Sequence, residues 1–102
     1  MIRSRKYLDR AKGQPCMVKI FGICNNDPTT TVMAHSNKYV HGKALGLKAH
    51  DIFCTLACSN CHSVIDGHTR TEYTKAEIDE FWQRGFERTL VLAFNEGWIR
   101  FT

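Results

Sequence analysis

The chain has 102 residues, of which 43% are hydrophobic and 24% charged, and its two prolines and seven glycines argue against a disordered or fibrous protein. A chain of this length forms one small domain in which burial alone gives marginal stability, so we expect an additional cross-link. It contains no run of about 18 apolar residues, and no apolar stretch follows its basic start, which predicts a cytoplasmic protein without a membrane partner.

Positive charge is concentrated in the first half of the chain. Residues 1–50 carry nine Lys or Arg and two Asp, whereas residues 51–102 carry five Lys or Arg and eight acidic residues. Because Lys and Arg release counterions when they neutralise phosphates, this surplus favours a polyanionic partner such as DNA. A solvated basic surface explains the same charge equally well.

The chain is predicted to begin with a basic N-terminal arm over residues 1–15, with a short helix around Tyr7. Residues 16–102 are assigned to a single domain, since we find no internal repeat and no second unit.

The domain is predicted to start with a hairpin. Residues 16–21 are rich in strand formers, the composition of residues 25–28 favours a turn, and residues 29–34 are predicted to form the second strand. This hairpin would carry both Cys16 and Cys24.

A long loop and a short helix follow. Residues 35–50 show no apolar period and are punctuated by Lys and Gly, which predicts a loop of the kind that is usually functional or disordered. Residues 51–57 are predicted to be a short strand. A short helix then runs from Ser59, an acceptable N-cap, to Gly67, an acceptable C-terminal stop.

The clearest helix begins at residue 74. Thr74 and Glu77 form a capping box, and apolar residues recur at helical spacing until residues 95–97 stop the helix. We interpret this apolar face as core, made by Ile78, Phe81, Trp82, Phe86, Leu90 and Ala93. Residues 98–101 are predicted to be a closing strand or a tail, and the mixture of elements predicts an α+β fold.

Four of the five cysteines have the arrangement expected of a structural zinc site. Cys58 and Cys61 form a C-x-x-C pair whose thiolates can converge on one tetrahedral ion, and Cys16 and Cys24 could supply the second pair. A chain without a secretory signal favours metal over disulfides. A thioredoxin-like redox pair is the alternative, but no parallel βαβ pattern surrounds it. Cys54 lies in an apolar run and is interpreted as a buried hydrophobe.

Histidines and a carboxylate surround the C-x-x-C pair. His62 directly follows Cys61, and Asp66 lies four residues later on the same helical face, where the two could share a second metal ion or a proton. His68 lies just past the predicted helix, and His35 ends the second predicted strand. His41 and His50 are interpreted as residues without a functional role.

These residues resemble the HNH endonucleases, whose ββα-metal core is built on a zinc-binding treble clef in many members. The matching elements are Ala34-His35 at a strand end, a loop containing Gly and Lys, and Cys58-Ser59-Asn60-Cys61-His62 leading into a helix. More narrowly, the chain is similar to the prophage-encoded YbcO-like family of nucleases over about residues 10 to 100. The resemblance implies a small zinc-stapled, HNH-like α+β domain with a longer C-terminal helix.

The resemblance also implies hydrolysis of DNA phosphodiester bonds. His35 would be the general base and His62 would bind a divalent cation such as Mg²⁺, Mn²⁺, Ni²⁺ or Zn²⁺. Ala34 stands where many HNH members have a ligating Asp, so Asp66 and His68 are the candidate replacements, with Asp51 next. The residue that orients the base has no obvious counterpart, and Asn37, His50 or Asp51 could take that role.

A second reading is a non-catalytic zinc-binding treble-clef module that binds nucleic acid in phage recombination or replication, because a fold does not guarantee an activity. In either reading the DNA-binding residues are expected to be Arg3, Arg5, Lys6, Lys38, Lys43 and Lys48. A thiol-redox or purely structural role is a third reading, and a homodimer would suit a nuclease that cuts both strands.

Overall fold

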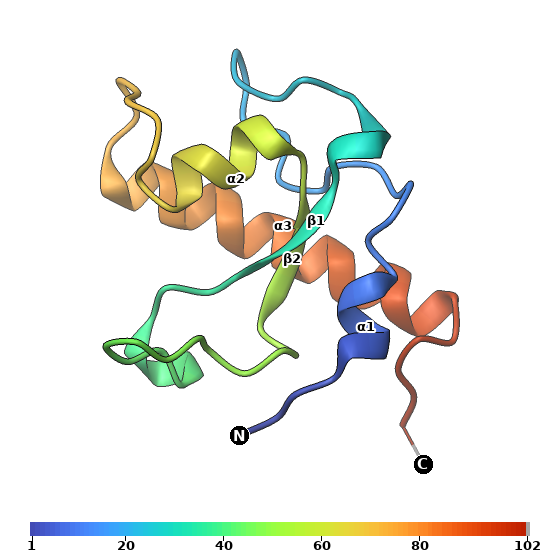
Figure 1. The fold of residues 1–102 in the computed structure, drawn as a ribbon. Helices are drawn as coiled ribbons and strands as arrows, with labels where there is room; N and C mark the ends of the chain where they lie inside the picture. Colours follow the sequence, from blue (N-terminus) through green and yellow to red (C-terminus); the bar gives the residue numbers. More distant parts are fainter. Residues whose placement is uncertain (102) are drawn as a thin grey trace.

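A two-stranded sheet packed between helices forms the centre of the computed structural model, which describes residues 1–101 (Figure 1). The predicted α+β class and the long C-terminal helix are confirmed. None of the described helices is both long and apolar enough to cross a membrane. In chain order the elements are α1 (Arg5–Asp9), a 3₁₀ helix (Pro28–Thr30), β1 (Val32–His35), a second 3₁₀ helix (Tyr39–His41), β2 (Cys54–Ala57), α2 (Ser59–Ile65) and α3 (Lys75–Asn95).

Strand β2 is the buried centre of the fold. It pairs antiparallel with β1, in a register that sets His35 opposite Cys54, and all four of its residues are buried. Helix α3 crosses β2 at Gly85, where an added Cβ would lie 2.6 Å from Thr55 Oγ1 and 3.0 Å from Val18 Cα. Only glycine therefore fits at this crossing without a shift of the neighbouring chain.

Helix α3 matches its prediction. Thr74 is the N-cap, and its reciprocal hydrogen bonds with Glu77 complete the capping box. The buried Trp82 donates through Nε1 to the Ala34 carbonyl oxygen at 3.2 Å, which ties the helix to β1. Thr89 Oγ1 accepts from the Leu56 N–H at 3.0 Å, so the helix also satisfies a backbone donor of β2.

The predicted N-terminal hairpin is wrong. Residues 16–21 form no strand, and the partner of β1 is β2 rather than this segment. Lys19 has a φ of 51°, a left-handed conformation that breaks an extended chain, and Gly22 has a φ of 79°. The segment therefore turns repeatedly, which allows Cys16 and Cys24 to approach the same point.

Smaller differences occur at the other element ends. The N-cap of α2 is Cys58, whose sulfur accepts from the Cys61 N–H, rather than the predicted Ser59. The short helix expected around Tyr7 is α1. Residues 98–101 form a tail without a strand.

The chain has two hydrophobic clusters. The first surrounds the cysteines and joins Val18, Ile20, Ala34 and Val64, with Ile78 and Phe81 of α3 packed against it. The second joins Tyr7 and Ala11 to Leu56 and Ala93, so the N-terminal residues contribute to a core. The division into an arm over 1–15 and a domain over 16–102 stays a prediction.

Candidate metal centre and histidine cavity

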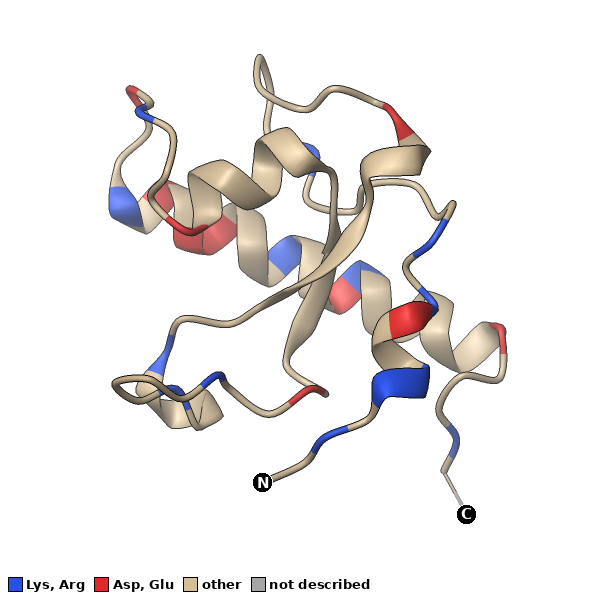
Figure 2. Cartoon of the chain, in the orientation of Figure 1, with Lys and Arg blue, Asp and Glu red and all other residues tan. Residues whose placement is uncertain are grey.

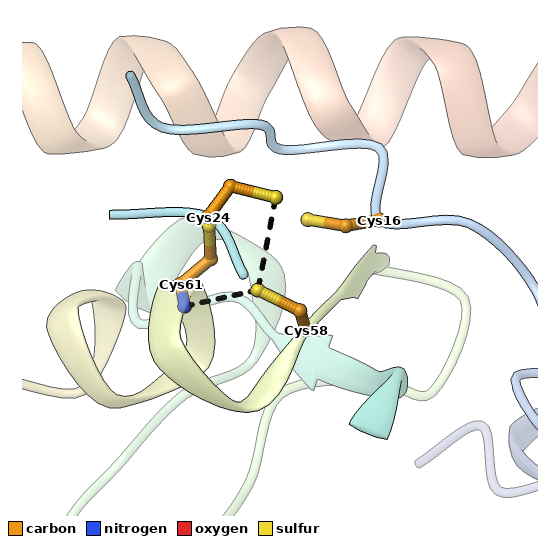
Figure 3. Close-up of side chains that lie close together, drawn as sticks. All are labelled: Cys16, Cys24, Cys58 and Cys61. Atoms are coloured by element: carbon orange, nitrogen blue, oxygen red, sulfur yellow. Dashed lines mark hydrogen bonds between the residues drawn. The ribbon is translucent and has the colours of Figure 1, made fainter. Parts of the chain in front are cut away.

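Four cysteines meet at one point between the irregular N-terminal segment and the start of α2 (Figure 3). Their sulfurs all lie within 4.8 Å of one another, and Cys24 Sγ is 3.9 Å from Cys58 Sγ. Thiolates about 2.3 Å from a tetrahedral zinc ion lie about 3.8 Å apart. The sulfur spacing and the all-thiolate donor set therefore fit a structural zinc ion held by Cys16, Cys24, Cys58 and Cys61.

Local backbone geometry aims hydrogen-bond donors at these sulfurs. The N-cap position of Cys58 turns its Sγ toward the Cys61 N–H at 3.4 Å, and the Lys19 N–H donates to Cys16 Sγ at the same distance. Such N–H groups stabilise thiolates, which are the metal-binding form of cysteine. The predicted C-x-x-C pair thus owes its geometry to the first turn of α2.

Within the cluster, the pKa values of Cys16 and Cys61 shift in opposite directions. A hydrogen bond from Cys61 and several backbone N–H groups lower the pKa of Cys16 far below its ordinary value, whereas the bond to Cys16 and burial raise the pKa of Cys61. Cys54 lies outside the cluster in the second core, where burial raises its pKa to about 12. Cys54 therefore stays a thiol at neutral pH.

A cavity of about 570 Å³ opens beside β1 and α2 and gathers the other predicted site residues. His35 contributes from the end of β1, and His62 and Asp66 contribute from α2 and its C-cap. The candidate site residues that line this cavity are Arg5, His35, Asn37, Lys43, Lys48, His62, Asp66 and His68.

His35 is held on its wall of the cavity by a buried carboxylate. Its Nε2 lies 2.8 Å from Asp51 Oδ1, and with Nε2–H donating to Asp51 the lone pair of the neutral ring is on Nδ1. Burial alone would raise the pKa of Asp51. Hydrogen bonds from His35, the Ser4 N–H (2.7 Å) and Arg3 (3.1 Å) outweigh it, so the pKa is lowered and the carboxylate stays charged.

His62 and Asp66 form an i, i+4 pair on the part of the cavity wall that α2 supplies, with 2.9 Å between Nε2 and Oδ2. The hydrogen bond from His62 lowers the pKa of Asp66, and Asn37 Nδ2 donates to the other carboxylate oxygen at 3.3 Å. His68 lines the same cavity. Within residues 1–101 the four cysteines are the only group of three or more metal-ligating side chains, so this wall gathers two close donors rather than three.

The predicted DNA-binding residues occupy different environments. Arg3 donates to Asp51 and to the carbonyl oxygens of Lys48 and Ala49, and its side chain is 41% exposed, so its contact with DNA stays a prediction. Lys and Arg residues of the N-terminal segment, of α1 and of the loop after β1 lie along one side of the fold (Figure 2). The link from Arg3 and Ser4 to Asp51 was missed in the sequence because the residues lie 47 or 48 positions apart.

Comparison with known proteins identifies the family. The family model described as "Putative nuclease YbcO" matches residues 5–98. Two proteins with that description, from Escherichia coli K12 and from Enterobacteria phage 82, are each 38% identical over 91 residues, which cover 88% of this chain and 92% of each relative. A solved structure described as a bacteriophage protein from Escherichia coli K-12 has 34% identity and a TM-score of 0.71, covering 88% of this chain and 98% of that one. The chain therefore belongs to the YbcO nuclease family.

Proposed function

We propose that the protein is a metal-dependent endonuclease of the HNH type that hydrolyses phosphodiester bonds in DNA. The observation that carries the proposal is the shared cavity, which is lined both by His35, held by Asp51, and by the His62–Asp66 pair. The family of the chain supports nuclease chemistry independently. The four cysteines, with zinc bound in a treble clef, would then serve as the scaffold.

His35 is the proposed general base. Its Nδ1 has no hydrogen-bond partner within residues 1–101 and can accept a proton from a water molecule as that water attacks phosphorus. Asp51 is the proposed positioning residue, because its carboxylate fixes the ring and stabilises the imidazolium that forms. Among the three candidates for this role, Asp51 is the one that forms a hydrogen bond with His35 within residues 1–101.

His62 and Asp66 are the proposed ligands of a divalent cation, with His68 as a third candidate. One imidazole nitrogen and one carboxylate oxygen suit Mn²⁺, Ni²⁺ or Zn²⁺, and Mg²⁺ would depend more on water and phosphate oxygens. The cation would neutralise charge on the phosphate and on the departing 3′ oxygen. Asp51 is not assigned as a ligand because both of its oxygens already accept hydrogen bonds from Arg3, Ser4 or His35.

The test is a plasmid-nicking assay with Mg²⁺, Mn²⁺, Ni²⁺ or Zn²⁺, comparing the wild type with His35→Ala. Loss of a general base lowers a rate by about 10²- to 10⁴-fold, so nicking should fall by that factor. The control is Gln83→Ala, because Gln83 lies on α3 outside the cavity lining and contacts neither His35 nor Asp51 through a hydrogen bond. His35→Ala should bind zinc as the wild type does and should still melt cooperatively, since the substitution leaves the cysteines intact, although loss of the hydrogen bond to buried Asp51 lowers its melting temperature.

A second candidate function is a zinc-binding module that binds nucleic acid without cleaving it. The specific observation in its favour is that only two donors lie close together on the His62 wall. DNA retention in a gel-shift assay without nicking under any of the four ions would support this module and overturn the endonuclease.

A further inference from the structure

The loop over residues 38–48 exposes large apolar side chains beside the histidine cavity. The exposed fractions are 84% for Tyr39, 82% for Val40, 104% for Leu45 and 43% for Leu47. Exposed apolar side chains that cluster in one segment commonly mark a binding surface. We call residues 38–48 the apolar loop.

The apolar loop is folded at its base and at its tip. His41 stacks on Phe53 with ring centroids 4.2 Å apart, and its Nδ1 lies 2.6 Å from Ser36 Oγ. At the tip, Ala44 and Leu47 exchange two backbone hydrogen bonds of 3.1 Å and 2.9 Å across a tight turn. The loop therefore presents its apolar side chains from an ordered platform, which lowers the entropic cost of binding.

The positive charge of the apolar loop favours a partner that carries negative charge. Lys38, Lys43 and Lys48 alternate with the apolar residues, and no acidic residue occurs between positions 38 and 50. Lys43 and Lys48 also line the histidine cavity, so the basic residues of the loop connect it to the proposed site of hydrolysis. A two-fold pairing of this loop with a second copy would bring lysines against lysines, which disfavours self-association. A nucleic acid offers both phosphates and apolar base faces.

We propose that the apolar loop inserts Tyr39 and Leu45 between DNA bases next to the phosphate held in the cavity, while Lys43 and Lys48 hold the flanking phosphates. Apolar wedges unstack base steps, and aromatic side chains stack on exposed bases. Unstacking costs least where bases are already unpaired, so the preferred substrate is forked or single-stranded DNA rather than a regular duplex. The position of the cut phosphate rests on the proposed function, whereas base insertion does not.

The test measures binding rather than cleavage, in a His35→Ala background that keeps the DNA intact. Forked and duplex DNA carry 2-aminopurine at successive positions, because the fluorescence of this base rises when it unstacks. We expect a position-specific rise on binding and tighter binding of forked DNA than of duplex. Tyr39→Ala and Leu45→Ser should remove the rise and weaken forked-DNA binding by about tenfold. Val91→Ser, which truncates an exposed apolar residue on α3, should change neither.

Other outcomes separate the alternatives. If Lys43→Ala weakens binding and lowers its salt dependence, while the Tyr39 and Leu45 variants retain full affinity and fluorescence, the apolar insertion is overturned. If sedimentation shows self-association of the wild type that Leu45→Ser abolishes, a second copy occupies the loop and the proposal is likewise overturned. Insertion observed in a protein that nicks no DNA with any ion would sustain this inference and refute the endonuclease.

Discussion

The cysteine cluster and the histidine cavity both include residues of helix α2, but the cluster is largely buried and the cavity is open to solvent. Cys58 and Cys61 are fully buried, and together with Cys16 and Cys24 they offer four donors at the spacing of a closed zinc site. On the cavity side, the His62 and Asp66 side chains are 38% and 31% exposed and supply two donors. Structural zinc sites are closed and catalytic metal sites keep open positions. One short helix thus joins a site suited to stability to a site suited to chemistry.

The largest effect is expected from breaking the closed site. Structural zinc contributes about 10–16 kcal/mol to zinc-finger peptides, which exceeds the total stability of most small domains of about 5–15 kcal/mol. Cys61→Ser, or removal of zinc by a chelator, should therefore abolish the cooperative melting transition seen by circular dichroism. Cys54→Ala is the matched control and should melt cooperatively. A chelated protein with an unchanged transition would exclude the four-thiolate site.

The second-largest effect is expected at the histidine cavity. Asp51→Asn should lower kcat for DNA hydrolysis by about 10- to 100-fold, because partners that orient a reactive histidine or ligand typically contribute that factor. KM should stay unchanged, since Asp51 contacts His35 rather than the substrate. Steady-state kinetics with bound zinc quantified in parallel checks both. A fall in kcat accompanied by loss of zinc would mean that Asp51 acts on the fold instead.

A smaller effect is expected where α3 supports the sheet. An added methyl at Gly85 would contact the Val18 backbone at 3.0 Å, which a rotamer change cannot relieve. Overpacking of this kind costs about 1–3 kcal/mol, so Gly85→Ala should lower the free energy of unfolding in urea by about 2 kcal/mol. Gln83→Ala, two residues earlier in α3, serves as the control and should be nearly neutral. An Ala variant as stable as the wild type would show that the crossing can widen.

The smallest effect is expected from the half-exposed pair on the open site. The folded-state pKa of Asp66 is below its ordinary value of 3.8, so its charged form adds stability above that pH, and this stability is lost as the pH falls through the folded pKa. Asp66→Asn should cost a few tenths of a kcal/mol at pH 6, and the difference should shrink as the pH falls below 3.8 and vanish below the folded-state pKa of Asp66. Urea unfolding of both proteins across this range measures it. A difference that persists at low pH would refute an electrostatic origin.

The sequence predicted best what is encoded locally. The capping box of Thr74 and Glu77 and the apolar period behind it defined α3, because neighbouring residues determine both. The spacing of Cys58 and Cys61 predicted convergence on one point, and their position at a helix start confers it. The four cysteines were grouped correctly although the backbone that carries Cys16 and Cys24 was not predicted.

The sequence did not predict the features that depend on contacts between distant segments. Residues 16–21 have strand-forming side chains, but the segment is not extended. Lys19 has a left-handed backbone conformation and its N–H donates to Cys16 Sγ, and these tertiary requirements override the strand propensity. His35 and Asp51 lie sixteen positions apart, and the loop between them has no hydrophobic periodicity. The sequence therefore named Asp51 only as one of three residues that could orient His35. The ion pair between Arg3 and Asp51 had no local signal in the sequence.

The strap formed by Ile2, Arg3 and Ser4 has a consequence for inactivation. These residues bond to His50, to Asp51 and to carbonyl oxygens of the 48–49 segment, yet the side chains of Ile2 and Arg3 are largely exposed and lie outside both hydrophobic clusters. Chain ends with few buried contacts detach at low free energy, well before global unfolding. Mild denaturant or warming should therefore release the proposed base and abolish the proposed nuclease activity while circular dichroism still records a folded protein.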